Sequence, residues 1–534
     1  MKTRLMLFAM VFAAALLPSL PGALAATADG DSARVALPDP VLAENLPRAI
    51  AARDSARIAA HEDRHRDAIR YYRRAVELYP PLEEELAVEL GHQYTWSDQP
   101  DSAMIWFRRH LAYHPDDTEA RNGVARLLSW RDDHEGAERL YNEVLADDPD
   151  NLDALLGRAQ VVNWSGRNRE ATWLYSDILD RFPGNTEATE GLARAYAWGG
   201  RPDWARETIA GAERTAGLAS VERDIDRERA PGLAYTFDRN TDSDDIERRT
   251  HTLRIGFGVD DVTRLSGEYS HGNYAQPGRP DVARNALAAV FERRFSEYVG
   301  VTAAAGYQWN SYDRAALGPE TYWQDEFNLF TFDGYVTFLP HDWTRIDIGL
   351  FHGSLQNPDA IFRGISLTAL SAGLDLRFNT NTVWITSLET AWYSDVNNRL
   401  GADTRLVWQP LWRLPIGLNH RFTSTTGFAA FGFDQSKDNG YYDPRQYLSL
   451  YEDLAVQMKF SARFRAELSG RIALEKENGG DWFTAGSFAA SATWAVWRGL
   501  GLTAGVYSSE SRLSSREGYQ ADGFYLTVDY LHWK

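Results

Sequence analysis

The sequence contains no cysteine. This absence excludes disulfide bonds, thiolate metal sites and a cysteine nucleophile. It also excludes the lipid-modified cysteine that would follow the signal peptide of a lipoprotein.

Long apolar segments are missing after the N-terminus. No later stretch offers about 20 consecutive apolar residues, which is the length that a membrane-spanning helix needs. The mean hydropathy of the chain is -0.43. Any segment that crosses a membrane is therefore expected to be a β-strand.

Positive charge is in short supply. The formal net charge is -19 and the sequence pI is near 5.1. Nucleic-acid binding needs stripes of Lys and Arg against the phosphates, so we expect no nucleic-acid partner. The length of 534 residues exceeds a usual single core and predicts at least two domains.

The N-terminus has the features of a signal peptide. Lys2 and Arg4 precede an apolar run over residues 5–17, and a small-x-small site ends at Ala25. This order predicts a cleaved signal peptide over residues 1–25, with a signal anchor as the alternative. Residues 26–47 are rich in Ala, Asp and Pro and are expected to be a linker.

A repeat with a period of about 34 residues follows. Small, aromatic, proline and tryptophan positions recur at 34- or 35-residue intervals between residues 68 and 205. The recurring residues are Ala68, Ala103, Ala137, Ala171 and Ala205; Tyr72, Phe107, Tyr141 and Tyr175; Pro80, Pro115, Pro149 and Pro183; and Trp96, Trp130, Trp164 and Trp198. The aromatic stands four residues after each alanine and so shares its helix face.

This pattern resembles the tetratricopeptide repeat family, whose unit is a pair of helices. The resemblance covers residues 48–217 in about five repeats and implies a solenoid that binds partner proteins. The alanines are expected where paired helices cross closely. The tryptophans are expected to pack between helices, and stacking on sugar rings is the alternative. Residues 218–231 are predicted to form a charged linker.

One motif in the first repeat matches a zinc-protease signature. His61, Glu62 and His65 satisfy H-E-x-x-H. The repeat register places them at the end of a helix, where we expect a solvated turn. We therefore assign no metal ligand, no catalytic residue and no cofactor.

From residue 232 to the C-terminus, short segments alternate apolar and polar residues. In residues 463–475, Phe464, Leu468 and Ile472 fall on one face, while Arg465 and Glu467 fall on the other. A period of two predicts a strand with one apolar and one polar face.

The connections between these segments alternate in length. Short turns such as Asp260-Asp261 and Ser461-Ala462 alternate with longer loops such as residues 311–325 and 434–445. About sixteen strands with short turns at one rim and long loops at the other are typical of a bacterial outer-membrane barrel. The fold class is therefore predicted as an N-terminal α-solenoid followed by an antiparallel transmembrane β-barrel over residues 232–534.

The polar faces are expected to line the barrel interior. An outward Arg or Lys at mid-bilayer would cost about 2–4 kcal/mol. Tryptophans at the ends of many strands are expected to form interfacial girdles. The charged candidates for the interior are Asp333, Arg345, Asp347, Asp375, Arg377, Glu389, Arg465, Glu467, Arg471 and Glu475. They are expected either to guide a ligand or to pair with one another.

The final segment, residues 524–533, resembles the terminal strand of outer-membrane barrels, although Lys534 follows its aromatic end. An even number of strands with a periplasmic C-terminus places the repeats in the periplasm. The expected location is thus the outer membrane, with lipid around the barrel and the N-terminal domain in the periplasm.

The order of solenoid and barrel resembles the exopolysaccharide export porins for poly-N-acetylglucosamine and cellulose, and the smaller YaiO-type barrel proteins. The resemblance implies a porin for polysaccharide export whose solenoid docks periplasmic proteins or the polymer. For a partly deacetylated, cationic glucosamine polymer, an acidic lumen would ease passage.

Two other functions stay open. The barrel is compatible with a non-conducting receptor or scaffold that uses its loops and solenoid as interaction surfaces. A barrel-anchored enzyme is the third reading, but no catalytic constellation stands out, so we expect no enzymatic activity.

Overall fold

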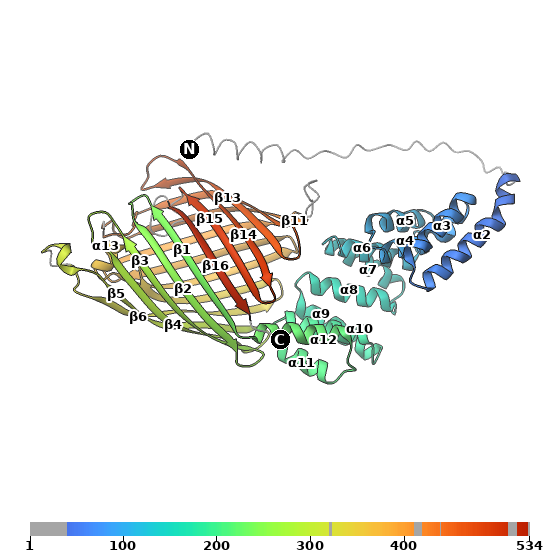
Figure 1. The fold of residues 1–534 in the computed structure, drawn as a ribbon, viewed down its shortest axis with the longest axis horizontal. Coiled ribbons are helices and arrows are strands. Elements are labelled where there is room, and N and C mark those ends of the chain that lie inside the picture. Colours follow the sequence, from blue (N-terminus) through green and yellow to red (C-terminus); the bar gives the residue numbers. More distant parts are fainter. Residues whose placement is uncertain (1–39, 320–322, 411–418, 438, 511–520, 532–534) are drawn as a thin grey trace. The chain divides into compact units, whose positions relative to one another are not determined.

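The computed structural model describes residues 40–319, 323–410, 419–437, 439–510 and 521–531. The chain divides into two compact units, residues 1–86 and 87–534. Helices occupy the first part of the chain and strands the rest (Figure 1). The predicted signal peptide lies outside the described residues. None of the described helices is both long and apolar enough to cross a membrane.

The first unit contains α2 (Pro40–His61), α3 (His65–Leu78) and the start of α4 (Leu82–Trp96). Because α2 begins at Pro40, residues 40–47 are helical where the sequence suggested a linker. Proline is well tolerated at the start of a helix, which explains the boundary. The H-E-x-x-H motif spans the turn from α2 to α3, and Glu62 pairs with Arg64 at 2.5 Å.

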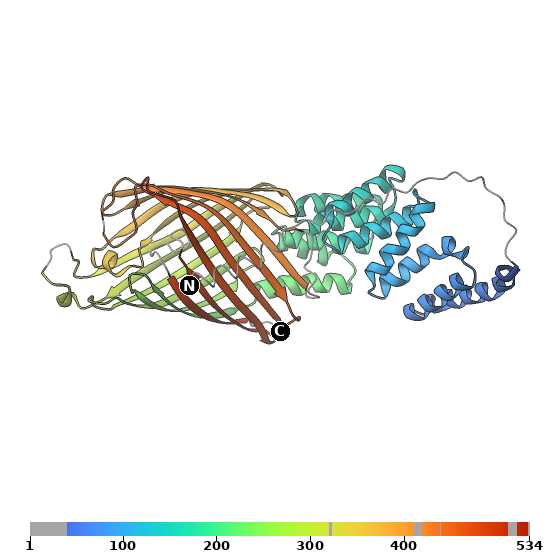
Figure 2. The same ribbon diagram turned by 90° about the horizontal axis from the view of Figure 1, so that it is seen from above.

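The second unit continues as a series of helix pairs, which lie side by side in Figure 2. The helices after α4 are α5 (Pro100–Tyr113), α6 (Thr118–Ser129), α7 (His134–Asp147), α8 (Leu152–Trp164), α9 (Asn168–Arg181), α10 (Thr186–Trp198), α11 (Pro202–Ala210) and α12 (Ala216–Arg229).

The repeat extends to the ends of the helices. Helices α6, α8 and α10 begin after Asp117, Asn151 and Asn185, each of which accepts a hydrogen bond from a backbone N–H three residues later at 2.8–3.1 Å. This N-terminal capping recurs every 34 residues. Two residues after each repeated tryptophan, the turn requires a left-handed backbone, supplied by Asp98, Asp132, Gly166 and Gly200.

The core of the solenoid is built by small residues and rings. All five repeated alanines are fully buried, and Tyr72, Phe107, Tyr141 and Tyr175 are at most 4% exposed. The ring of Tyr141 fills the space above Gly157 in the next helix pair, where an added Cβ would lie 2.3 Å from the ring. Tyr175 meets Gly191 in the same way. Each ring therefore joins one repeat to the next.

Helix α12 replaces the charged linker that the sequence suggested for residues 218–231. Leu218, Val221 and Ile225 are buried and pack against Ala193 and Ala205 of the last helix pair. Their spacing of three and four residues gives α12 an apolar stripe despite its many charges. The solenoid thus ends with a packed helix at residue 229, two residues before the first strand.

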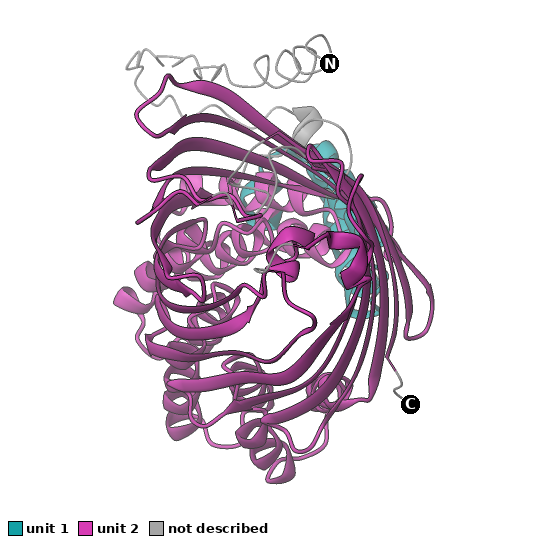
Figure 3. Cartoon of the chain, turned by 90° about the vertical axis from the view of Figure 1, so that its left-hand side faces the viewer, with its two compact units in different colours: residues 1–86 teal, residues 87–534 magenta. Residues whose placement is uncertain are grey.

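Sixteen antiparallel strands close into a barrel, with β1 paired to both β2 and β16. Figure 3, an end-on view, shows the strands as a ring. The strands are β1 (Gly232–Asp242), β2 (Glu247–Gly258), β3 (Thr263–Ala275), β4 (Val282–Arg294), β5 (Val299–Ser311), β6 (Phe327–His341), β7 (Thr344–Ser354), β8 (Ser366–Asn379), β9 (Thr382–Tyr393), β10 (Asn397–Trp408), β11 (Asn419–Phe433), β12 (Tyr447–Lys459), β13 (Phe464–Glu477), β14 (Phe483–Trp497), β15 (Leu500–Ser509) and β16 (Ala521–Leu531).

This arrangement confirms the prediction of a helical-repeat region followed by an antiparallel barrel of about sixteen strands. We call the rim that carries the connections β2–β3, β4–β5 and β6–β7 the short-turn rim. Gly232 and Leu531 pair at this rim, so the barrel begins and ends there. The opposite long-loop rim carries α13 (Pro358–Phe362) and a 3₁₀ turn at Arg314–Leu317.

The two faces of the barrel differ in character. On β13, Leu468, Ile472 and Leu474 point outward and are 38–52% exposed. The tryptophans at strand ends are likewise exposed: Trp309, Trp343, Trp384, Trp392, Trp408, Trp494 and Trp497. An apolar outer surface with tryptophans near its edges is typical of outer-membrane barrels. Glu452 is a polar exception, and Ser424 and Thr426 on the neighbouring strand donate hydrogen bonds to it.

We expect Gly157→Leu to destabilise the solenoid by about 1–3 kcal/mol, because the larger side chain overpacks the junction with Tyr141. Thermal unfolding followed by the helical circular dichroism signal measures the effect. Gly211→Ala is the matched control, since its added Cβ meets only ordinary contacts beyond 3.6 Å. Equal unfolding temperatures for the two variants would contradict the packing role of the ring.

Candidate functional site

All ten charged candidates lie on the inner face of the barrel, opposite the exposed apolar residues. Several pair with each other or with cations that the sequence analysis had not named. Arg345 donates to Asp347 at 2.7 Å, and Arg399 of β10 pairs with Glu389 of β9. Arg471 binds both oxygens of Asp453 at 2.5 and 2.7 Å. Cations and carboxylates therefore neutralise one another over much of this face.

A linked network joins side chains of three strands, β10, β12 and β13. Tyr451 donates to Asp403 at 2.7 Å, and Arg405 donates to the same carboxylate at 2.8 Å. The guanidinium of Arg471 lies 4.2 Å above the Tyr451 ring. Such a network fixes side chains inside the barrel wall. Asp403, Arg405 and Asp453 are not among the predicted residues, because their proximity depends on how the strands align.

The remaining candidates have other surroundings. Gln457 donates to Glu467 at 3.0 Å, Glu475 is fully buried, and Arg377 donates to the Ser165 carbonyl at 3.2 Å. Within the described part of the chain, Asp333, Asp375 and Arg465 form no ion pair. The inner face is thus a mixture of signs rather than the acidic lining that a cationic polymer would favour.

Helices of the second unit contact one arc of the short-turn rim. Asp342, in the turn before β7, accepts from Arg169 at 3.2 Å, and Asp261, in the turn before β3, accepts from Arg206 at 2.7 Å and Arg229 at 3.0 Å. Arg264 donates to the Glu228 carbonyl at 2.7 Å. These contacts involve β2, β3, β6 and β7, so this arc holds the solenoid.

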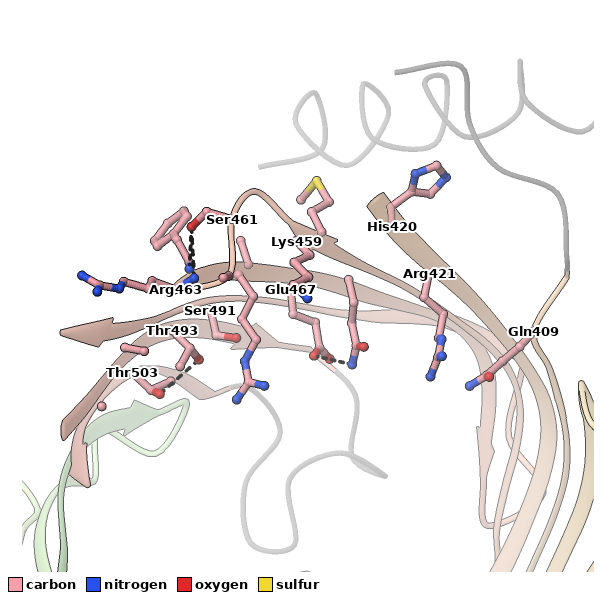
Figure 4. Close-up of a pocket in the computed structure, with 18 of the residues that line it drawn as sticks. Gln409, His420, Arg421, Lys459, Ser461, Arg463, Glu467, Ser491, Thr493 and Thr503 are labelled. Atoms are coloured by element: carbon pink, nitrogen blue, oxygen red, sulfur yellow. Dashed lines mark hydrogen bonds between the residues drawn. The ribbon is translucent and has the colours of Figure 1, made fainter. Parts of the chain in front are cut away.

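The other arc of the rim borders a cavity of about 1320 Å³, lined by barrel residues together with Arg131, His134 and Trp164 of the helices. Figure 4 shows Arg421 and Glu467 on the concave side of the strands there. We call five exposed cations of this arc the basic rim: Arg421, Lys459, Arg463, Arg465 and Arg498.

Only Arg465 of this group was among the predicted residues. A signal for a second member was present in the sequence, because Lys459 and Arg465 stand at equal distance from Ala462 in a tight hairpin. Residues placed in this way face each other across an antiparallel pair, as Lys459 and Arg465 do. The other members belong to separate hairpins, and the barrel had to close before they shared a space.

At the long-loop rim, the segment Leu355 to Ile365 between β7 and β8 folds into a buried position. We call it the strap. Ile361 and Phe362 of α13 pack with Tyr274, Val282 and other loop residues, while Leu355, Ala360 and Ile365 pack with Phe433 and Tyr441.

Polar contacts tie the strap to distant strands. Arg248 of β2 donates to the Gln356 carbonyl at 3.0 Å, and Arg279 in the loop after β3 pairs with Asp359 at 3.1 Å. Arg248 also pairs with buried Asp242 at 2.8 Å on the inner face. Since β2 and β7 are five positions apart around the barrel, the strap reaches across the opening at this rim.

A groove follows the repeated tryptophans of the solenoid. Trp130, Trp164 and Trp198 line it, together with His134 and Asn163. Trp96, Trp130 and Trp198 are 55%, 47% and 52% exposed. These three rings are therefore about half exposed where packing between helices was expected, whereas Trp164 is half-buried beside the His134 ring. Each of the four stands at the end of its helix, beside a left-handed turn.

The floor of this groove carries unused hydrogen-bonding atoms. Asn163 is 3% exposed, yet its Oδ1 has no hydrogen-bond partner among the described residues. The same holds for Asn168 Oδ1 and His134 Nδ1. Buried polar atoms are rarely left unsatisfied. Exposed aromatic faces beside unused amide and imidazole atoms are suited to a ligand with both apolar and hydroxyl-bearing faces.

Burial lowers the pKa of His134 below its ordinary value. The neighbouring carboxylates of Asp132 and Asp133 raise the pKa, and Arg167 lowers it further, but the loss of hydration is the largest influence. His134 is therefore neutral at pH 7 and offers one donor and one acceptor. Among the described residues, no group of three His, Asp or Glu side chains is arranged to hold a metal ion.

No known protein family matches the sequence, and no curated protein matches it either. Solved structures are similar in fold over parts of the chain. A bacterial polysaccharide outer membrane secretin is 11% identical, with 57% of this chain and 99% of that chain covered and a TM-score of 0.46. CdiB from Acinetobacter baumannii is 9% identical over 56% of this chain and 60% of that chain, with a TM-score of 0.38. MamA is 18% identical over 34% of this chain and 94% of that chain, with a TM-score of 0.27.

The lowered pKa of His134 predicts a pH-dependent solenoid. Because the unfolded state binds the proton more readily, the neutral histidine's contribution to stability is complete above the unfolded pKa near 6.5. That contribution is lost as the pH falls toward the lower folded pKa. We expect the helical unfolding temperature to fall between pH 7 and pH 5, and to fall less in His134→Gln. Parallel pH curves for the two proteins would contradict this assignment.

Proposed function

We propose that this protein is an outer-membrane conduit that exports a polysaccharide, with its helical repeats on the periplasmic side. The observation that carries the proposal is the cavity at the short-turn rim. There, residues of the helices and of the barrel line one space, which is continuous with the polar inner face of the strands. A polymer held by the solenoid would meet the barrel entrance directly.

The tryptophan groove supports a saccharide rather than a peptide as cargo. Sugar rings present apolar faces that stack on indole and hydroxyl edges that need hydrogen-bond partners. Trp130, Trp164 and Trp198 offer indole faces for stacking. Asn163 Oδ1 and His134 Nδ1, which have no partner among the described residues, can bond to hydroxyl groups. One ring per repeat suits a ligand that is itself a repeating chain. The proposed conduit carries out no covalent chemistry.

The strap is placed to limit the leakage of small solutes through a wide barrel. Its apolar residues are buried among loops from several hairpins, and its polar contacts reach β2. A membrane barrel wide enough for a polymer would otherwise leak small solutes. We propose that the strap restricts the long-loop opening at rest and moves aside for the polymer.

The ordered loop cluster also favours a second candidate, a surface receptor or scaffold. Aromatic residues of three loops, including Trp323, Phe362 and Tyr441, hold this rim in one shape. A fixed loop surface is what a binding partner would recognise. Conductance decides between the two functions, because a receptor needs no open path.

The first test is electrical. We expect the full-length protein in a planar bilayer to show small conductance, and a variant with residues 356–364 replaced by a Gly-Ser segment of equal length to conduct severalfold more. Substituting Gly480 and Asp481, exposed residues of another long-loop connection, is the control and should leave conductance unchanged. A strap variant that never conducts would refute the conduit and leave the receptor.

The second test concerns the groove. We expect Trp130→Ala, Trp164→Ala and Trp198→Ala each to weaken binding of soluble oligosaccharides by about tenfold, or about 1.4 kcal/mol. Isothermal titration of the full chain in detergent with a panel of β-linked oligosaccharides measures the change. Trp173→Ala is the matched control, since Trp173 is 78% exposed and lies outside the groove. Equal losses in all four variants would argue against stacking.

A further inference from the structure

We propose that the polymer is anionic, with carboxylate groups such as those of uronic acids, and that it enters the barrel over the basic rim. This inference rests on the proposed export function and names the chemical class of its cargo. It runs against the overall charge of the chain, which is -19. An anion would be repelled by the molecule as a whole unless the entrance carried the opposite sign.

Within the described part of the chain, the cations of the basic rim have no carboxylate partner and, unlike Arg264 and Arg377, donate no hydrogen bond to a carbonyl of the helical region. Among the described residues, Arg421, Lys459, Arg463, Arg465 and Arg498 make no ion pair with a carboxylate. Elsewhere on the inner face, Arg345, Arg399 and Arg471 are all paired with carboxylates. Of the described residues that line the cavity, the carboxylates are Asp132 of the helical region and Glu467 and Asp529 of the strands, and Glu467 is bound to Gln457.

Two of these cations directly oppose each other. Lys459 of β12 and Arg465 of β13 are partners in the antiparallel register, with both side chains on the inner face. Like charges placed opposite each other destabilise a strand pair. Neither side chain forms an ion pair with a described carboxylate, so an external anion would relieve their repulsion.

The way the solenoid is held leaves this arc free. Its contacts with the rim use the turns before β3 and β7, together with Arg264 and Arg377. The basic rim belongs to β11–β15 and their turns, where no described helix residue forms an ion pair with it. The attachment is thus one-sided, and the cationic arc faces the open part of the cavity.

The chemistry of the side chains suits carboxylates carried on a chain. Guanidinium groups bind carboxylates with two parallel hydrogen bonds, and four of the five cations are arginines. All five are exposed, so each individual contact would be weak. Several weak sites in a row favour movement of a polymer over tight retention.

Lipid headgroups offer negative charge too, but the geometry favours the interior. Arg421, Lys459 and Arg465 lie on the same face of their strands as the polar lining residues, opposite outward Phe464 and Leu468. Side chains on this face point away from the surrounding bilayer. Retention of phosphatidylglycerol by the purified protein, lost in the triple variant below, would overturn the assignment.

Ion selectivity tests whether the basic rim makes the electrostatic potential at the barrel entrance positive. We expect the strap-replaced protein to prefer chloride over potassium in a KCl gradient. Adding Arg421→Gln, Lys459→Gln and Arg465→Gln should lower the anion-to-cation permeability ratio on the order of threefold to tenfold. The control removes three positive charges outside the barrel, at Arg66, Arg73 and Arg108. An unchanged ratio in the rim variant, or an equal change in the control, would overturn the proposal.

Polymer block tests the cargo. Oligogalacturonate added at the short-turn side should block the current at about tenfold lower concentration than neutral cello-oligosaccharides, and the effect should weaken in high salt. Cationic chitosan oligosaccharides should block least. Stronger block by the neutral or cationic polymer would overturn the anionic assignment.

A binding measurement separates this inference from the export function. Titration of the full chain in detergent with oligogalacturonate needs no open barrel. Binding that the triple variant loses, in a protein that never conducts, would refute export and preserve the anion site. Conduction without anion selectivity or anion binding would preserve export and refute the anionic cargo.

Discussion

The hydrogen bonds between β1 and β16 are the constraint on which the rest of the structure depends. They close the sheet, so each of the described strands is paired on both sides. They also bring the first and last strands of the barrel together at the short-turn rim. Because the chain enters the barrel at this rim, the solenoid connects here and not at the rim of the long loops.

This connection has an asymmetric result. Helix α12 ends at Arg229, and Arg229 itself pairs with Asp261 in the first short turn. Arg206 binds the same carboxylate, and the contact of Arg169 with Asp342 lies farther along the same arc. The helices therefore bond to one side of the short-turn rim, and the other side borders the cavity. The cations of the basic rim lie on the side that carries none of these contacts. The residues that hold the helices are therefore different from the cations that stay exposed.

Much of the fold could be predicted from the sequence, because both periodicities are local. The 34-residue recurrence of alanine and aromatic residues identifies helix pairs, and the alternation on residues 463–475 identifies a strand with a charged face. Helix α12 is harder to predict from the sequence, because its many charges obscure the apolar stripe of Leu218, Val221 and Ile225. Residues 40–47 were read as a linker because composition alone does not reveal a helix that is held by its neighbours.

Predicting the candidate site requires the register of neighbouring strands as well as the apolar/polar alternation within each strand. The face of each charged residue follows from alternation, but its partner follows from the neighbouring strand. Arg471 and Arg465 look alike in the sequence, yet one binds Asp453 and the other faces Lys459. The tryptophans were misjudged for a related reason. Their recurrence suggested packing, but Trp96, Trp130 and Trp198 stand at the ends of their helices beside a left-handed turn and stay about half exposed.

The 34-residue spacing of those tryptophans means that the number of encoded repeats determines how long a ligand the groove can hold. Each helix pair adds one ring to the groove, and each new pair brings its own buried alanine, ring-to-glycine junction and capping residue. Insertion or loss of one 34-residue unit would therefore lengthen or shorten the groove by one step without altering the barrel. The number of repeats therefore sets the length of the groove, and duplication of a repeat within the coding sequence would lengthen it.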